Sequence, residues 1–455
     1  MTAGGRHRAI PSGRRPGRSP TLVNSIWGAF GEGGRILTQG LLLLVLARVL
    51  GPAPFGRFAG ATALLQLCGP LIWFGAPSLL VMRYASRTAS LSEACSTATT
   101  TIAGSGLLGI GVVLALRPLI LPKITWQDFL ILALAELVFS GLVENFAVAG
   151  WAIERLALSA AIRWFSGGLR VAGLAIFVAL RGSGSQEHLW YIVYLLCTIC
   201  AAVATALLLR IAAGMRLRLS FPRRAQLLVG LPFSIGSTAF SVQDSIDTPL
   251  VLDLSSATAA GIYSAAYRVV VVALVPIRAL LMSIYASMFR VGKVGLTGTA
   301  PLARRYTSRM LPYGIVAVAM LILTSSWVSS FFGPGFSETA SAIRWLAPLP
   351  VLRVLNTFVG DALTGAGWNG KRIRIQLLTA TFHVALCVIL IPKISWHGAA
   401  VATFASESLL AGLLWALLRR MEKTYPAGGP GPATPSAWES PDESSARIVG
   451  LAELT

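Results

Sequence analysis

Charge is scarce in this 455-residue sequence. Asp, Glu, Lys and Arg together make up 12% of it, whereas an ordinary soluble protein is about 25% charged. Hydrophobic residues make up 55%, which excludes intrinsic disorder, and a large soluble domain would need more charge on its surface. The composition therefore predicts a polytopic membrane protein.

Histidine and cysteine are also rare, with four and five residues. The histidines are scattered along the chain, and the C-x-x-C pattern at 197–200 has no second pair beside it. Metal centres and redox motifs need such residues in clusters, so we expect no metal site and no cofactor.

Long apolar runs fill most of the chain. A helix crosses the ~30 Å hydrocarbon core with about 20 apolar residues. Twelve segments meet this length, near 21–50, 58–82, 95–116, 129–151, 158–180, 188–209, 226–252, 257–289, 310–332, 341–366, 375–391 and 397–418. The sequence therefore predicts an all-α polytopic membrane protein of about twelve transmembrane helices.

Lys and Arg are distributed unevenly between the loops. With both termini cytoplasmic, 25 of the 38 basic residues lie in cytoplasmic segments, 5 in outer loops and 8 within helices. Cytoplasmic loops of membrane proteins carry this excess. We therefore expect a multi-pass protein of the cell membrane with both termini inside. Its net charge of +20 follows from topology, so no nucleic-acid partner is expected.

A weak internal repeat groups the spans into two sets of six. The segment GRFA at 56–59 precedes the second span, and GIYS at 261–264 precedes the eighth, 205 residues later. Chance similarity is an alternative, but parallel repeats of this kind occur in transporters and predict two six-helix halves around a central cavity. The predicted parts are a basic cytoplasmic tail (1–20), an N-terminal half (21–210), a cytoplasmic connector (211–225), a C-terminal half (226–420) and a disordered cytoplasmic tail (421–455).

The segments between spans are short. The longest interior loop, 290–309, is predicted to have about twenty residues, too few for a separate domain. No A-x-A cleavage site follows the N-terminal tail, so the first helix is expected to be a retained span. Two similar hexapeptides, LPKITW at 121–126 and IPKISW at 391–396, are interpreted as Trp/Lys anchors at the membrane interface.

Ionisable residues inside the predicted spans are the most informative set, because each costs at least ~2.5–3.5 kcal/mol at the bilayer centre without a cavity or a partner. The cations are Arg35, Arg48, Arg163, Arg170, Arg268, Arg278, Arg344 and Arg353. The acids are Glu32, Glu136, Glu144, Asp244, Asp247, Asp361 and Glu407. Arg48 and Arg344 lie close enough to helix ends to reach the interface. Acids would neutralise some of the other arginines, and the rest would line a water-filled cationic cavity.

Asp244 and Asp247 are three residues apart and share a helical face. Such a pair could hold magnesium on a diphosphate, as in prenyl-transferring enzymes, but that chemistry needs a second, facing acidic cluster, which the sequence lacks. A cation or proton site in a transporter fits better, and a partner for a deep arginine fits better still.

Four stretches in sequence order resemble one family. The segment ARVLGPAPFG at 47–56 resembles the A-R-x-L-G-P-x-x-[YF]-G signature of Wzx-type polysaccharide flippases, in the multidrug/oligosaccharidyl-lipid/polysaccharide export superfamily. SID at 245–247 with GIYSAAYR at 261–268, FGP at 332–334 with LA at 346–347, and GAAVA at 398–402 resemble its later landmarks. Ser245 departs from the pattern, because the family often has Arg at this position.

The resemblance implies a flippase that moves a polyprenyl-diphosphate-linked oligosaccharide from the inner to the outer leaflet without covalent chemistry, so we expect no enzyme activity. The expected partners are this substrate, membrane lipids and other proteins of surface-glycan assembly. The task needs cations for the diphosphate, and the candidates are Arg170, Arg268, Arg278 and Arg353, with Arg35 in addition. Candidates for ion coupling are Asp247, Glu136 and Glu144.

Three rival functions stay open. A cation-coupled multidrug exporter of the same superfamily would have an anionic interior, whereas eight arginines against seven acids lean toward an anionic substrate. A glycan polymerase or ligase typically carries a large outer loop, and the outer loops here are short. A scaffold for the glycan machinery would survive loss of the deep arginines, unlike a flippase.

Overall fold

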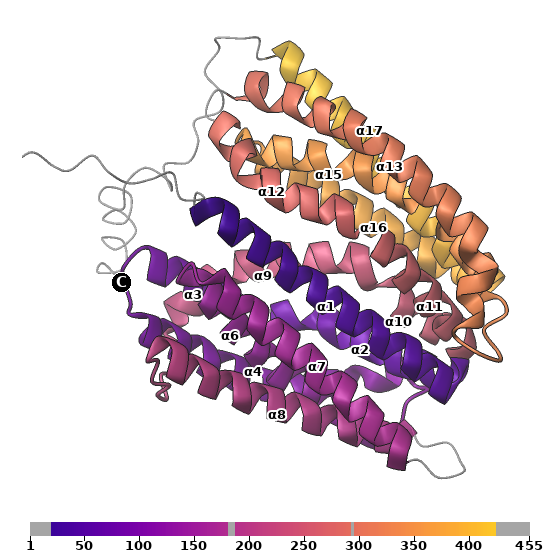
Figure 1. The fold of residues 1–455 in the computed structure, drawn as a ribbon, viewed down its shortest axis with the longest axis horizontal. Helices are drawn as coiled ribbons and strands as arrows, with labels where there is room; N and C mark the ends of the chain where they lie inside the picture. Colours follow the sequence, from indigo (N-terminus) through magenta and orange to yellow (C-terminus); the bar gives the residue numbers. More distant parts are fainter. Residues whose placement is uncertain (1–19, 181–186, 293–294, 425–455) are drawn as a thin grey trace, which may run out of the picture.

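The computed structural model describes residues 20–424 apart from 181–186 and 293–294, and the described segments fold into helices joined by short turns (Figure 1). Residues 1–19 and 425–455, which make up nearly all of the two predicted tails, lie outside this part of the chain.

The helices of the first half of the chain are α1 (Pro20–Leu50), α2 (Pro52–Ile72), α3 (Ala76–Ala85), α4 (Leu91–Ile120), α5 (Trp126–Ala133), the π-helical segment η1 (Leu134–Ser140), α6 (Gly141–Ala152), α7 (Leu156–Leu180) and α8 (Glu187–Ala213). Those of the second half are α9 (Arg224–Ser245), α10 (Asp247–Leu254), α11 (Ala257–Ala273), α12 (Val275–Gly292), α13 (Leu296–Ser330), α14 (Thr339–Leu346), α15 (Leu349–Gly365), α16 (Asn369–Ile394) and α17 (Trp396–Thr424).

The number of spans agrees with the sequence. Among the described residues, eleven helices or near-continuous helix pairs are long and apolar enough to cross a bilayer, and α11 with α12, bent by 46°, makes a twelfth. Each predicted span has a counterpart, so the prediction of an all-α protein with about twelve spans is confirmed. One loop prediction was wrong: most of 290–309 is helical, because α13 begins at Leu296 and runs for 35 residues.

Several helix boundaries follow from local chemistry. Ser90, Thr125 and Ser256 cap α4, α5 and α11, each accepting a hydrogen bond from the backbone N–H three residues later. The second predicted span is divided into α2 and α3 at Gly75, whose φ of +63° is a conformation that glycine adopts without strain. The seventh is divided into α9 and α10 at Ile246.

Small residues let α1 lie close against α7. Gly31 faces Ala160, Gly34 faces the ring of Trp164, and Gly167 faces Thr38, with no room for a side chain at any of the three glycines. Close approach over small residues is the usual way in which helices associate in lipid, where van der Waals contact replaces the hydrophobic effect.

The two parts of the chain lie side by side (Figure 1). In this view α3, α4 and α6–α8 form one side, α12, α13 and α15–α17 form the other, and α1, α2 and α9–α11 lie between them. Helix α2 contacts α9, α10 and α11, and α1 contacts α11 and α12. These helices therefore form the interface between the two parts, and they line any site that lies there.

The predicted repeat starts meet at one end of this interface. A side-chain carbon at Gly56 would collide with the carbonyl of Ala257, and one at Gly261 would collide with the carbonyl of Pro52. Beside them the rings of Phe55 and Phe336 lie 6.2 Å apart, edge to face. This reciprocal crossing of α2 and α11 brings the two parts into direct backbone contact.

The two similar hexapeptides converge at the same end. Lys123 Nζ donates to the carbonyls of Leu252, Asp253 and Ser255, at 2.8, 2.9 and 2.8 Å. The hydroxyl of Ser395, from the second hexapeptide, lies 2.7 Å from that of Ser255. A cation at the carbonyl end of α10 is favourable because the helix dipole is negative there. Both hexapeptides thus hold the end of α10, a contact that spacing alone did not predict.

Candidate functional site

A cavity of about 160 Å³ lies between the two parts of the chain, farther along α2 and α11 than the glycine crossing. Its lining comes from α1, α2, α9, α11 and α12, and consists of Arg35, Ile36, Gln39, Gly40, Gln66, Asp244, Ser245, Tyr267, Arg268, Val271, Val272 and Arg278. We call it the central cavity. Three of the five arginines expected to contact substrate line it, although they come from α1, α11 and α12.

The central cavity is rich in positive charge. Asp244 is the one carboxylate in its lining among the described residues, and its contact with Arg278 is long, with 3.5 Å between Nη2 and Oδ2. Arg268 is half-buried and makes no hydrogen bond or ion pair with a described side chain. A desolvated cation without a partner carries a large energetic penalty, so this guanidinium is placed to bind an anion.

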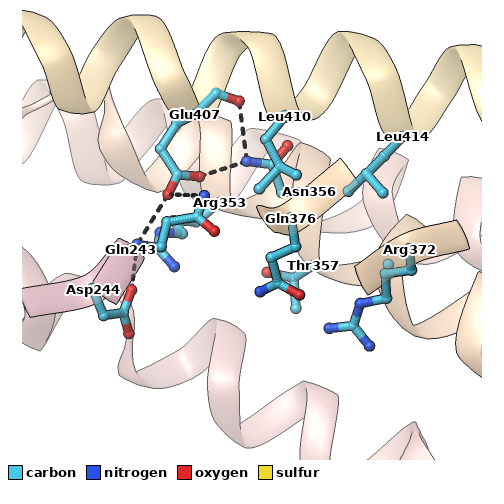
Figure 2. A pocket seen from close by; sticks show the side chains of 11 residues that line it. Gln243, Asp244, Arg353, Asn356, Thr357, Arg372, Gln376, Glu407, Leu410 and Leu414 are labelled. Atoms are coloured by element: carbon cyan, nitrogen blue, oxygen red, sulfur yellow. Dashed lines mark hydrogen bonds and ion pairs between the residues drawn. The ribbon is translucent and has the colours of Figure 1, made fainter. Parts of the chain in front are cut away.

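A second cavity, of about 60 Å³, lies inside the C-terminal part (Figure 2). We call it the C-terminal cavity. Arg353 of α15 bonds Asp244 of α9, and its Nη2 lies 3.0 Å from Glu407 Oε1 of α17. Asn356 donates to the other oxygen of Glu407 at 2.6 Å, and Gln243 contacts Glu407 at 3.4 Å. Arg353 thus joins three helices through two carboxylates.

The remaining arginine of the C-terminal cavity also has a carboxylate partner. Arg372 of α16 lies 3.3 Å from Asp361 and donates to Thr364 at 2.6 Å. Arg353, one of the five expected substrate contacts, therefore does not line the central cavity. It is linked to that cavity through Asp244, whose side chain lines both cavities.

Arg170, another of the expected contacts, lies in the N-terminal part. Its Nη2 donates to Ser140 at 2.8 Å, and its guanidinium lies over the ring of Tyr194, 5.0 Å from the centroid. Tyr194 donates to Glu136, a buried carboxylate of η1. Gln66 bonds the other oxygen of Glu136 at 3.4 Å and lines the central cavity. Single π-helical turns are frequent at functional sites, and this one carries Glu136 toward the central cavity.

Glu144 and Asp247, the other candidates for ion coupling, differ in environment. Glu144 pairs with Arg163 at 2.7 Å, and 41% of its side chain is exposed. Asp247 is buried in the C-terminal part, where it accepts hydrogen bonds from Tyr263 at 2.7 Å and Thr403 at 3.1 Å. Asp244 and Asp247 therefore separate, although they are three residues apart, because the chain breaks between them at Ile246.

Sequence reasoning missed two side chains at Asp247. His383 Nε2 lies 2.6 Å from Asp247 Oδ1, and Cys387 Sγ lies 3.4 Å from the same oxygen. The three polar atoms lie within 4.8 Å of one another. The spacing of four between His383 and Cys387, which places both on one face of α16, was the available signal.

Comparison with known proteins relates the chain to proteins of polysaccharide biosynthesis and to a flippase. The model of the "Polysaccharide biosynthesis protein" family matches residues 22–290. The "Probable flippase AglR" of Haloferax volcanii is 27% identical over 188 residues, a match that covers 40% of this chain and 39% of that flippase. The matched region thus spans about two fifths of the length of this relative.

Solved structures share the fold over most of their length. An inward-facing multidrug resistance MATE family transporter of the MOP superfamily is similar with a TM-score of 0.63 and 15% identity, over 89% of this chain and 98% of that one. A MOP superfamily transporter from Pyrococcus furiosus, described as having a binding pocket of reverse polarity, gives 0.63 and 14%, over 89% and 96%. The family model matches more than half of the chain, so the chain belongs to the polysaccharide biosynthesis protein family and has the fold of MOP superfamily transporters.

Proposed function

We propose that the protein is a flippase that moves a polyprenyl-diphosphate-linked oligosaccharide from the inner to the outer leaflet for cell-surface polysaccharide synthesis. The observation that carries the proposal is the central cavity, where Arg35, Arg268 and Arg278 face one carboxylate. Guanidinium groups bind phosphate oxygens through two parallel hydrogen bonds. The positive charge of Arg268, which has no ion-pair partner among the described side chains, suits an anionic headgroup better than a cationic drug.

The polar residues of the same lining suit the sugar part of the headgroup. Gln39, Gln66 and Ser245 supply amides and a hydroxyl, and Tyr267 supplies an aromatic ring with a hydroxyl. Sugar hydroxyls need donors and acceptors of this kind when they leave water. Translocation needs no covalent step, so the protein acts as a transporter and not as an enzyme.

We propose that residues 21–210 and 226–420 move as two halves, with both termini in the cytoplasm. In this orientation the end closed by Gly56, Gly261 and Lys123 faces outward. Outward movement of a diphosphate with about two negative charges is favoured by ~4–5 kcal/mol at ~100 mV, inside negative.

The other expected residues take secondary places in this scheme. Arg353 acts on the central cavity through Asp244, and Arg170 acts through Glu136 and Gln66. Asp247 and Glu136, both buried, are the candidates for ion coupling, while Glu144 is half-exposed and paired. Other proteins of surface-glycan assembly are expected to supply the substrate and to use the product.

The test is reconstitution of the protein in liposomes that contain a fluorescent undecaprenyl-diphosphate oligosaccharide. Transfer between leaflets is measured by quenching from outside, for the wild type, Arg268→Gln and Arg344→Gln. Arg344 bonds Ser325 and Ser326 away from the central cavity and is the matched control. We expect transfer by the wild type and by Arg344→Gln, and at least a tenfold loss in Arg268→Gln.

Cells that lack the protein separate the proposal from its rivals. Complete lipid-linked oligosaccharide should accumulate, and surface polymer should be lost, when the lipids are quantified by mass spectrometry. Unchanged lipids with altered drug sensitivity would favour a multidrug exporter, and unpolymerised glycan at the outer surface would favour an enzyme.

A further inference from the structure

A histidine and an aspartate face each other in the interior of the C-terminal part. His383 of α16 is 0% exposed, and Asp247 of α10 is 3% exposed. Their atoms Nε2 and Oδ1 lie 2.6 Å apart. A second such pair, His188 with Asp128, has the same distance but lies at the surface, with 56% of the histidine side chain exposed. The protonation of the buried pair therefore depends on the surrounding side chains, whereas the surface pair exchanges protons freely with solvent.

The hydrogen bonds of the buried pair fix the positions of its protons. Ser406 Oγ donates to the carbonyl of Thr403 at 3.0 Å, so it accepts from His383 Nδ1 at 2.8 Å, and Nδ1 carries a hydrogen. Two bare acceptors do not approach to 2.6 Å, so one more proton lies between Nε2 and Asp247 Oδ1. The pair therefore holds two protons and has no net charge.

The two oxygens of the Asp247 carboxylate have different partners. Oδ2 of Asp247 accepts from Tyr263 of α11 and Thr403 of α17, and Cys387 of α16 contacts Oδ1. Glu407 of α17 is a charged group that acts on His383. It is held in turn by Arg353 of α15 and, through Arg353, linked to Asp244 of α9. With Arg278 on Asp244, this second network has two arginines for two carboxylates, so the shared proton sets the charge of the pair.

Two short segments connect this pair with the central cavity. At the break between α9 and α10, Asp244 lines the central cavity and Asp247 binds His383. Within one turn of α17, Thr403 and Ser406 contact the pair, while Glu407 holds Arg353. A change at the pair therefore reaches the charged lining of the central cavity by two routes, across the break at Ile246 and along one turn of α17.

We propose that His383 and Asp247 form a proton-binding site that couples proton movement to the conformational change of the C-terminal half, and that the structure holds its proton-loaded form. The coupling rests on the proposed flippase function, whereas the proton site itself does not. Release of the shared proton to solvent leaves a neutral imidazole and a carboxylate, so the pair changes from no charge to one negative charge.

The released state cannot keep the observed geometry. After loss of the proton, the lone pair of His383 Nε2 faces Asp247 Oδ1 at 2.6 Å, and two acceptors at that distance repel each other. Separation of α16 from α10 relieves this repulsion. The same separation moves the break at Ile246 and, with it, the contacts of Asp244 with Arg278 and Arg353.

Nitrogen NMR of a single-histidine protein tests the site without any transport. His7, His188 and His397 are replaced by Gln, and the ¹⁵N signals of His383 are followed against pH in the full-length protein. We expect Nδ1 to stay protonated while Nε2 loses its proton in one step. In Thr403→Val, which removes one donor to the carboxylate, the midpoint of this step should rise. A bare Nδ1, or signals that do not change wherever the protein is folded, would overturn the proton site.

Transport against a pH gradient tests the coupling in liposomes at zero membrane potential. A gradient should change the wild-type flipping rate at least tenfold, His383→Gln should lose this response, and His188→Gln should keep it. An unchanged response in His383→Gln overturns the coupling, as does an equal response to a sodium or zinc gradient at constant pH. If the wild type moves no lipid at all, the flippase proposal fails, while the NMR titration still decides the proton site.

Discussion

The central cavity and the C-terminal cavity contain the same kind of cation with different partners. In the C-terminal cavity, Arg353 contacts two carboxylates and Arg372 contacts a third at 3.3 Å. In the central cavity, Arg268 has no partner among the described side chains, and Arg278 reaches Asp244 only at 3.5 Å. The partners of these arginines therefore differ, and we expect the partners to decide what each arginine does.

This difference separates two roles. A guanidinium between two carboxylates joins helices, and its removal leaves buried charge without compensation. A guanidinium that faces a cavity is available to an anionic ligand. Changes in the C-terminal cavity should therefore act first on stability, and changes in the central cavity should act first on transport.

The largest expected effect on stability is that of Glu407→Ala. Glu407 is 1% exposed and holds Arg353 and Asn356. Its loss leaves two buried polar groups without their partner, which costs about 3–5 kcal/mol. The free energy of unfolding in detergent, followed by tryptophan fluorescence, measures the loss. Glu93→Ala, at an exposed pair with Arg83, is the control and should change stability by at most about 1 kcal/mol.

Asp244→Asn removes a negative charge from both cavities, because Asp244 lines both and contacts an arginine in each. Arg278 loses its carboxylate and Arg353 keeps only Glu407. We expect tighter binding of a diphosphate lipid, by about tenfold or 1.4 kcal/mol, together with slower release and a lower flipping rate. Titration of lipid binding and liposome assays measure the two quantities, and weaker binding would contradict the assignment of the central cavity.

Arg353→Lys keeps the charge of the C-terminal cavity but removes the planar fork. Both carboxylates contact the same nitrogen, Nη2 at the far end of the guanidinium, and the shorter lysine side chain does not carry its ammonium to that position. Each lost hydrogen bond to a charged group is worth about 1.5–3 kcal/mol, so we expect unfolding to become easier by about this amount. The same change at Arg268 should leave stability unaltered.

The smallest expected effect is that of Glu144→Gln in the N-terminal part. Its ion pair with Arg163 is half-exposed, with 41% of the Glu144 side chain accessible. Such pairs contribute about 0.2–1 kcal/mol, so the free energy of unfolding should change by at most that amount. A loss as large as that of Glu407→Ala would show that the contribution of an ion pair to stability does not increase with its burial in this protein.

Much of the fold was predictable from local sequence. The length of each apolar run and the positions of Lys and Arg fixed the number of spans and their expected orientation, because a span depends only on residues within about 20 positions. The prediction of an interior loop at 290–309 was wrong, because helix α13 extends beyond its apolar part through polar residues such as Arg304 and Arg305.

The sequence by itself identified Arg35, Arg170, Arg268, Arg278 and Arg353 as deep cations, and proposed that Asp244 partners a deep arginine, which the contacts of Asp244 with Arg278 and Arg353 confirm. Only the tertiary structure decided which cations share a cavity, since that depends on the rotation and tilt of separate helices.

The same holds for the buried proton site. Asp247 was visible in the sequence as an acid inside a span, but its partner His383 is 136 residues away. A break of a single residue at Ile246 turns Asp244 toward the central cavity and Asp247 toward α16. Helical spacing places these two acids on one face, so only the observed break could separate them.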